Sequence, residues 1–170
     1  FIACDTTNIK KIKKIINLTK TNKIQIGYKF GLEFMNSKNG RHFVKTLRNK
    51  IIFVDLKLND TVNTMLSTIK ALKDININYL TVHISSGLAA LKAVKKVSGS
   101  LKIIGVTTLT SLNNNDLKLI GYDKSVNHLV VHQAKLAKRA ALDALVCSPY
   151  EVSAVRKIFK NEIITPGVQI

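Results

Sequence analysis

The stretch Ile51-Ile52-Phe53-Val54-Asp55-Leu56-Lys57 joins an apolar run to two charges near its carboxyl end. Its first four residues are β-branched or aromatic, which predicts a buried strand. Because the side chains of a strand alternate between its two faces, Asp55 and Lys57 are expected to share one face, opposite Leu56. Charges at the end of a buried strand need a partner or a function. The stretch therefore predicts both a sheet and a functional site at one edge of it.

Strand-like runs of the same kind recur along the chain and alternate with amphipathic stretches of helical period, of which Ile9, Ile12, Ile15 and Ile16 are an example. This alternation predicts a parallel sheet covered by helices. The strands are near-continuous apolar runs, as expected when both faces of the sheet are buried. We expect strands at residues 1–5, 24–30, 51–56, 79–83, 101–108, 142–147 and 162–164.

Two α/β architectures fit this alternation: an open doubly wound sheet and a closed (β/α)₈ barrel. The first predicted strand-to-helix turn, Asp5-Thr6-Thr7-Asn8, has no glycine-rich dinucleotide motif. Polar residues gather instead at strand ends, where a barrel keeps its active site; they are Asp5, Lys29, Asp55, Lys57, His83, Thr108 and Thr110. We therefore predict a TIM (β/α)₈ barrel, with residues 1–170 forming one domain.

The length of the chain bears on how much of a barrel it contains. A complete barrel has eight strands and ~250 residues, whereas the chain has 170 residues and about seven strand-like runs. We expect the last strand and helix to be missing from this chain. The chain begins at Phe1, without a Met and within a strand-like run, so we also expect it to start inside its first element.

The chain is strongly basic, with a formal net charge of +17. Such a charge suits an RNA-binding protein, which remains an alternative from another class. However, the lysines are spread over nearly every predicted helix and alternate with apolar residues, as on a solvated face. Aromatic residues do not interleave with them to form a stacking platform. We therefore expect no nucleic-acid partner, although a basic surface would attract a phosphorylated substrate.

Other compositional features narrow the class of protein. No apolar run approaches the ~20 residues that span a bilayer, so we expect no membrane association. The two cysteines, Cys4 and Cys147, are far apart in apolar runs, which favours buried thiols in a cytoplasmic protein. His128 and His132 are spaced i, i+4, but no acidic residue accompanies them at metalloprotease spacing, so we expect no metal site.

A set of four charged residues carries the candidate chemistry. Lys29 lies at the end of its predicted strand, where it could meet Asp55. Asp60 immediately precedes a predicted helix at 61–73. Each has a plainer explanation: Asp60 could be a helix N-cap, Asp55 with Lys57 a structural ion pair, and Lys29 a surface lysine at a strand end. Together, Lys29, Asp55, Lys57 and Asp60 predict an array of alternating charge, which is typical of a site that stabilises charge in a transition state.

Residues 55–64, Asp55-Leu56-Lys57-Leu58-Asn59-Asp60-Thr61-Val62-Asn63-Thr64, resemble the Asp-x-Lys-x-x-Asp-x-x-Asn-Thr signature of bacterial orotidine 5′-phosphate decarboxylases. Further stretches match the family in order along the chain. They are Ala3-Cys4-Asp5, Tyr28-Lys29-Phe30-Gly31-Leu32-Glu33, Val82-His83, Val106-Thr107-Thr108-Leu109-Thr110-Ser111, Val146-Cys147-Ser148-Pro149 with Glu151, and Thr165-Pro166-Gly167. The resemblance covers nearly the whole chain and implies decarboxylation of orotidine 5′-phosphate to UMP.

The resemblance also implies a role for each matching residue. Lys57 would donate the proton to C6 of the pyrimidine, and Asp55 would face the carboxylate of the substrate. Lys29 and Asp5 would hold ribose hydroxyls. The remaining substrate-binding residues it implies are Asp60, Thr61, Asn63, Thr64, Thr110, Gly167 and Gln169. Asp60 and Thr64 reach the partner's active site in this family, which implies a homodimer with shared sites. The resemblance separately implies a reaction that needs no cofactor.

Two departures from the family, and one sister activity, qualify this resemblance. Gln169 stands where the family usually has an Arg, and it cannot form a charged pair with phosphate. The family's phosphate-binding Gln and final Gly-Arg would lie beyond Ile170. The sister enzymes 3-keto-gulonate 6-phosphate decarboxylase and hexulose-phosphate synthase share the Asp-x-Lys-x-x-Asp motif, but they resemble one another in having an acidic residue where this chain has Lys29. Lys29 therefore favours the orotidine enzyme.

Overall fold

A computed structural model describes residues 1–167 of the chain, and in them seven parallel strands form one sheet in the order β1-β2-β3-β4-β5-β6-β7. The order never reverses, whereas a doubly wound sheet has a switch point at which it does. Consecutive parallel order is that of a (β/α) barrel, so the predicted fold class is confirmed. The strands are β1 (Ile2–Ala3), β2 (Gly27–Gly31), β3 (Ile51–Leu58), β4 (Tyr79–His83), β5 (Lys102–Val106), β6 (Ala144–Val146) and β7 (Glu162–Ile164).

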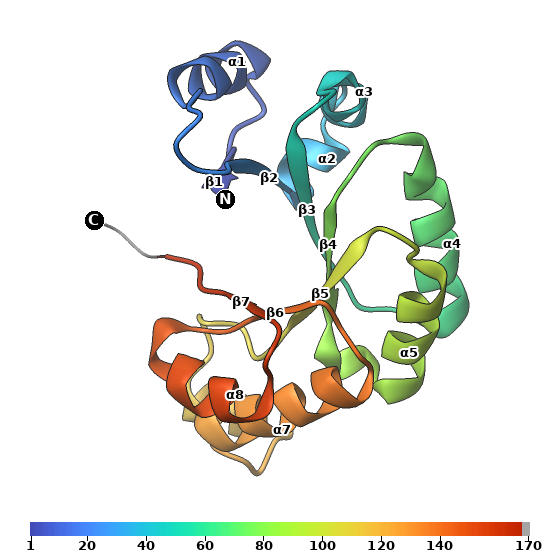
Figure 1. The fold of residues 1–170 in the computed structure, drawn as a ribbon. Helices are drawn as coiled ribbons and strands as arrows, with labels where there is room; N and C mark the ends of the chain where they lie inside the picture. Colours follow the sequence, from blue (N-terminus) through green and yellow to red (C-terminus); the bar gives the residue numbers. More distant parts are fainter. Residues whose placement is uncertain (168–170) are drawn as a thin grey trace.

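Helices connect the strands and lie outside the curved sheet (Figure 1). The α-helices are α1 (Ile9–Leu18), α2 (Leu32–Asn36), α3 (Gly40–Thr46), α4 (Val62–Ala71), α5 (Leu88–Val97), α6 (Asn114–Leu119), α7 (Val126–Arg139) and α8 (Val152–Ile158). Short 3₁₀ turns are η1 (Leu72–Asp74), η2 (Ile84–Ser86) and η3 (Pro149–Glu151). None of the helices in this part of the chain is long and apolar enough to cross a bilayer.

The apolar core has two parts, one on each face of the sheet. The larger part packs the helices against the sheet and includes the fully buried Ile12, Phe30 and Leu91. The smaller part is centred on Phe53, Ile104 and Ala144. Phe53 lies two residues before Asp55 in β3, so the smaller cluster forms the floor beneath the charged end of the strand.

The predicted element boundaries need correction in several places. Strand β2 begins at Gly27 rather than at residue 24, β5 ends at Val106 rather than at residue 108, and β1 and β6 are each shorter than predicted. Before β2, Ile26 packs against the core from the connection while Ile24 is 68% exposed, so apolar residues extend beyond the strand and hydrophobicity alone overestimates its length. The helix predicted at 61–73 divides into α4 and the 3₁₀ turn η1.

The largest local departure is in β3, which is longer and less regular than predicted. Val54 pairs with Leu80 and Leu58 pairs with Val82, so four steps along β3 oppose two along β4. Lys57, inside this irregular segment, has a φ of 48°, in the left-handed region. A bulge of this kind bends a strand and redirects a side chain. Simple alternation placed Asp55 and Lys57 on one face correctly, but it did not predict this backbone.

Candidate active site

Four charged side chains meet at the carboxyl ends of the first three strands. Asp5 follows β1, Lys29 lies in β2, and Asp55 and Lys57 lie in β3. Lys29 Nζ is 3.2 Å from Asp5 Oδ1 and 3.8 Å from Asp55 Oδ2. Lys57 Nζ is 2.8 Å from the same Asp55 oxygen. The side chains therefore form a spatial series, Asp5, Lys29, Asp55 and Lys57, in which negative and positive charges alternate.

Asp55 is the centre of this network. Its side chain is only 13% exposed and accepts from Lys57 Nζ. A carboxylate in such a place needs partners of opposite charge to offset its lost hydration, and it has Lys29 and Lys57. Because these cations come from neighbouring parallel strands, the sheet itself holds the network in place. The predicted meeting of Lys29 with Asp55 is confirmed by this geometry.

Thr81 joins the network from β4 and was not predicted. Its hydroxyl donates to Asp55 Oδ1 at 2.9 Å and accepts the backbone N–H of Lys57 at 2.8 Å. Thr81 is only 1% exposed. The signal for it in the sequence was weak: one threonine within the apolar run 79–83, whose hydroxyl must find a partner if buried.

The charged residues line one wall of a cavity of about 670 Å³. That volume suits a small organic ligand. Thr110 and Gly167, both predicted to bind substrate, line the same cavity. Its lining residues are Phe1, Ala3, Asp5, Lys29, Phe53, Asp55, Lys57, Val106, Thr108, Leu109, Thr110, Val146, Cys147, Ile164, Thr165, Pro166 and Gly167.

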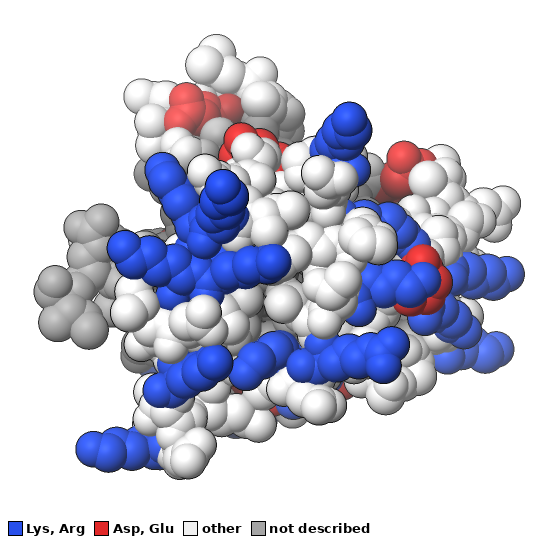
Figure 2. All heavy atoms as spheres, turned by 90° about the horizontal axis from the view of Figure 1, so that it is seen from above, with Lys and Arg blue, Asp and Glu red and all other residues white. Residues whose placement is uncertain are grey.

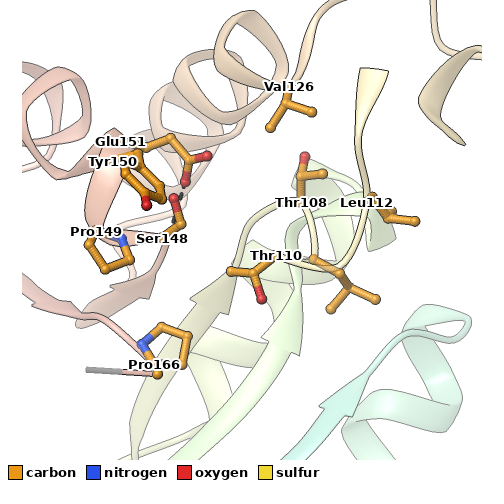
Figure 3. A pocket seen from close by; sticks show the side chains of 11 residues that line it. Thr108, Thr110, Leu112, Val126, Ser148, Pro149, Tyr150, Glu151 and Pro166 are labelled. Carbon is orange, nitrogen blue, oxygen red and sulfur yellow. Dashed lines mark hydrogen bonds between the residues drawn. The ribbon is translucent and has the colours of Figure 1, made fainter. Parts of the chain in front are cut away.

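A second hollow, of about 370 Å³, adjoins this cavity and shares Thr108, Thr110 and Gly167 with it. Figure 3 shows Thr108 and Thr110 on one side of it and the segment with Ser148 and Glu151 on the other. The two hollows extend the site from the charged network toward the ends of β5, β6 and β7.

Side chains outside the cavity hold these loops in place. Gln133 in α7 is buried, and its Oε1 accepts from the backbone N–H of Thr108 at 2.8 Å and from its hydroxyl at 3.1 Å. Glu151 accepts from the backbone N–H of Ser148 at 2.8 Å in a capping box. Neither contact was predicted. The contact of Gln133 joins segments 25 residues apart that meet only in the folded chain, whereas the capping box of Ser148 and Glu151 is a local pattern that the sequence could have shown.

The segment 60–64 does not join the network within one chain. The side chains of Asp60, Thr61, Asn63 and Thr64 are exposed, and none of them lines the cavity. Asp60 forms no ion pair with any other residue of 1–167. It accepts instead from the backbone N–H of Thr61 at 2.6 Å. That bond and one with the side chain of Thr64 hold the pKa of Asp60 below its ordinary value.

The N-cap interpretation of Asp60 is wrong, because Thr61 occupies that position of α4. The hydroxyl of Thr61 lies 3.1 Å from that of Thr64, so the start of α4 carries a compact polar group facing outward. Gln169 lies outside the described residues.

Three further ionisable groups lie near the site. Burial lowers the pKa of His83, at the end of β4, and the charge of Lys57 lowers it further, against the opposing effect of Asp55. Burial raises the pKa of the thiols of Cys4 and Cys147 to about 11, so both thiols are protonated at neutral pH. Over residues 1–167, no three His, Cys, Asp or Glu side chains group as metal ligands do.

Consecutive parallel strands with a charged cavity at their carboxyl ends define the class of β/α-barrel enzymes. A comparison with protein families identifies the family within that class. The family model described as "Orotidine 5'-phosphate decarboxylase / HUMPS family" matches residues 1–170, and the chain belongs to this family. The resemblance inferred from the motifs is thereby confirmed.

Individual relatives agree with the family. The chain is 43% identical over 150 residues to the orotidine 5′-phosphate decarboxylase of Wolbachia pipientis subsp. Culex pipiens (strain wPip), covering 84% of this chain and 65% of the relative. It is 35% identical over 173 residues to the enzyme of that name from Erythrobacter litoralis, covering 99% and 76%. The chain thus spans less than two thirds of the Wolbachia protein.

A solved structure supports the fold. The crystal structure of the orotidine 5′-phosphate decarboxylase from Lactobacillus acidophilus superposes with a TM-score of 0.84 at 29% identity. The superposition covers 99% of this chain and 80% of that one. The seven strands described above therefore correspond to part of a known barrel.

Proposed function

We propose that the protein decarboxylates orotidine 5′-phosphate to UMP, the last step of UMP synthesis, in the cytoplasm. The observation that carries the proposal is the network of Asp5, Lys29, Asp55 and Lys57 along one wall of a cavity of ligand size. Family membership supports it, since relatives that are 35% and 43% identical to the chain carry that name. No cofactor or metal takes part in the proposed reaction.

Lys57 is the proposed proton donor. When the bond between C6 and the carboxylate breaks, carbon dioxide leaves and the electron pair stays on C6 as a carbanion. The ammonium of Lys57 stabilises that charge as it develops and then transfers a proton to C6. Asp55 holds the ammonium at 2.8 Å, so the donor is oriented before the substrate binds.

Other residues of the cavity bind the remainder of the substrate in this proposal. Asp55 faces the carboxylate, while the ammonium of Lys29 donates hydrogen bonds to the ribose hydroxyls and the carboxylate of Asp5 accepts hydrogen bonds from them. Thr110 contacts the pyrimidine or the phosphate, and Gly167 lies by the phosphate. All five line the same cavity, which supports a single ligand that touches them together.

A homodimer with shared sites is the second part of the proposal. Asp60 and Thr64, with Thr61 and Asn63, would enter the partner's cavity and complete the alternating array. Their exposure and outward position at the start of α4 support this, because they are available to a second copy and not to their own cavity. The hydrogen bonds from Thr61 and Thr64 that lower the pKa of Asp60 favour its anionic form, which suits a neighbour of a lysine.

The charge of the surface suits an anionic substrate. Figure 2 shows one face on which Lys and Arg side chains greatly outnumber acidic ones, in keeping with the net charge of +17. A field of this sign raises the encounter rate with a phosphorylated ligand and weakens with ionic strength. We therefore expect kcat/KM to fall as salt is raised.

The decisive experiment follows the loss of absorbance of orotidine 5′-phosphate in the presence of EDTA. We expect turnover without added metal, and the same protein should not act on sugar phosphates. Activity that requires a divalent cation and a sugar phosphate would assign the sister activity instead.

Sharing of sites is tested by mixing two inactive variants, Lys57→Ala and Asp60→Ala. A mixed dimer contains one site with both native residues, so about half of the sites of each mixed dimer should be active if subunits exchange freely. Mixtures that recover no activity, although exchange is demonstrated with labelled subunits, would contradict a shared site.

A further inference from the structure

We propose that Thr81 is a positioning residue that holds both the carboxylate of Asp55 and the backbone of Lys57 in their working geometry. This inference rests on the proposed function, in which Lys57 donates the proton. Thr81 comes from β4, the strand next to the one that carries Asp55 and Lys57. It does not line the cavity, so it acts through its neighbours and not on the substrate.

The direction of each hydrogen bond of Thr81 follows from the chemistry of its partners. An ionised carboxylate only accepts, so the Thr81 hydroxyl must donate its one proton to Asp55 Oδ1, 2.9 Å away. Its oxygen is then free to accept the N–H of Lys57, 2.8 Å away. The hydroxyl thereby links the side chain of Asp55 to the main chain of Lys57.

This arrangement divides the two oxygens of Asp55 between two tasks. Oδ1 is held by Thr81, while Oδ2 receives Lys57 Nζ at 2.8 Å and lies 3.8 Å from Lys29 Nζ. A carboxylate tethered at one oxygen cannot rotate freely, so the other oxygen stays directed at the two lysines. Thr81 thus determines where the ammonium of Lys57 is held.

The second hydrogen bond acts on an unusual piece of backbone. Lys57 has a φ of 48°, which a residue with a side chain rarely adopts. Such a conformation persists only when the surrounding structure holds it in place. Because the bulge interrupts the regular pairing of β3 with β4, the N–H of Lys57 donates to the side chain of Thr81. Without the Thr81 hydroxyl, that N–H would lose its partner and the segment could relax.

The test compares Thr81→Val, which keeps the β-branched shape but loses the hydroxyl, with Thr81→Ser, which keeps the hydroxyl. We expect Thr81→Val to lower kcat by about 10- to 100-fold, since a misplacement of ~1 Å can cost ~10²-fold. KM should change less than about twofold, because binding contacts remain. Thr81→Ser should recover most of the lost kcat, which a role in packing alone would not predict.

A control and a spectroscopic readout separate positioning from general destabilisation. Thr19→Val removes a hydroxyl that is also hydrogen-bonded, to Ile15 O and Tyr28 Oη at 2.8 Å and to Ile16 O at 3.4 Å. Thr19 does not line the cavity. We expect it to leave kcat unchanged. Hydrogen exchange of the Lys57 amide, followed by NMR, should be faster in Thr81→Val and close to native in Thr81→Ser.

The outcomes distinguish a failure of the proposed function from a failure of the proposed role of Thr81. An unaltered protein that does not decarboxylate orotidine 5′-phosphate contradicts the proposed function, and the exchange of the Lys57 amide then still reports whether Thr81 holds that backbone. If the unaltered protein is active, native kcat in Thr81→Val overturns the role of Thr81. Equal losses of kcat in the Val and Ser variants, or an effect on KM alone, overturn it as well.

Discussion

Replacing Lys57 by alanine removes the proposed proton donor and one of the two cations of Asp55. Asp55 would then keep Lys29, at 3.8 Å, and its bond from Thr81. Loss of a general acid costs ~10²–10⁴-fold in rate, and loss of an electrostatic stabiliser costs ~10²–10³-fold. One side chain supplies both effects, so they do not simply multiply. We expect kcat to fall by at least about 10³-fold, or ~4 kcal/mol of transition-state stabilisation.

The backbone of Lys57 allows loss of chemistry to be separated from loss of stability. A residue with a Cβ pays about 1–2 kcal/mol to hold left-handed dihedral angles, and glycine does not. Because the φ of Lys57 is 48°, Lys57→Gly should be more stable than Lys57→Ala by about 1 kcal/mol. The two variants should nevertheless be equally inactive.

The assay is loss of substrate absorbance at saturating orotidine 5′-phosphate, together with urea unfolding of each variant. Lys45→Ala is the matched control, because Lys45 is an exposed lysine whose ion pair is with Asp74 and not with the cavity. Its kcat should be native. A Lys57→Ala variant within tenfold of the native kcat would refute the role of Lys57, and a Gly variant less stable than the Ala variant would refute the strained backbone.

Three further predictions concern pH, thiol reactivity and packing. The pKa of His83 is lowered from 6.5 in the folded protein, so the unfolded state binds the proton more readily, and the free energy of unfolding should fall as pH drops below about 6.5. Cys4 and Cys147 are buried with pKa values of about 11, so both should react slowly with a thiol reagent at pH 8 and rapidly in urea. Gly40→Ala should destabilise the fold by about 2 kcal/mol or more, because a Cβ there would lie 1.7 Å from the backbone oxygen of Phe34.

Controls make these outcomes specific. His83→Gln should reduce the loss of stability between pH 7 and pH 5, whereas the same change at His132, exposed on α7, should not. Equal pH dependence in both variants would contradict the assignment to His83. Gly31→Ala should be tolerated because no atom lies within 4 Å of its added Cβ, so equal destabilisation at both glycines would contradict the packing argument. Fast labelling of both native thiols would contradict their burial.

Local patterns were sufficient for the class of fold and for the centre of the site. The alternation of strand and helix predicted a parallel sheet, and polar strand ends favoured a barrel. Side-chain alternation placed Asp55 and Lys57 on one face, and the order of the strands brought Lys29 next to them. These inferences succeeded because periodicity is a property of each segment alone, and parallel strands necessarily end at one edge.

The sequence by itself determined the family, the barrel class and the charged residues at the ends of β1, β2 and β3. Only the tertiary structure decided how those residues are held: the bulge at Lys57, the buried hydroxyl of Thr81 and the contact of Gln133 with the loop after β5. It also placed Asp60 outside its own chain's network. Hydrogen bonds between segments far apart in the chain depend on register and side-chain direction, and no local pattern encodes either.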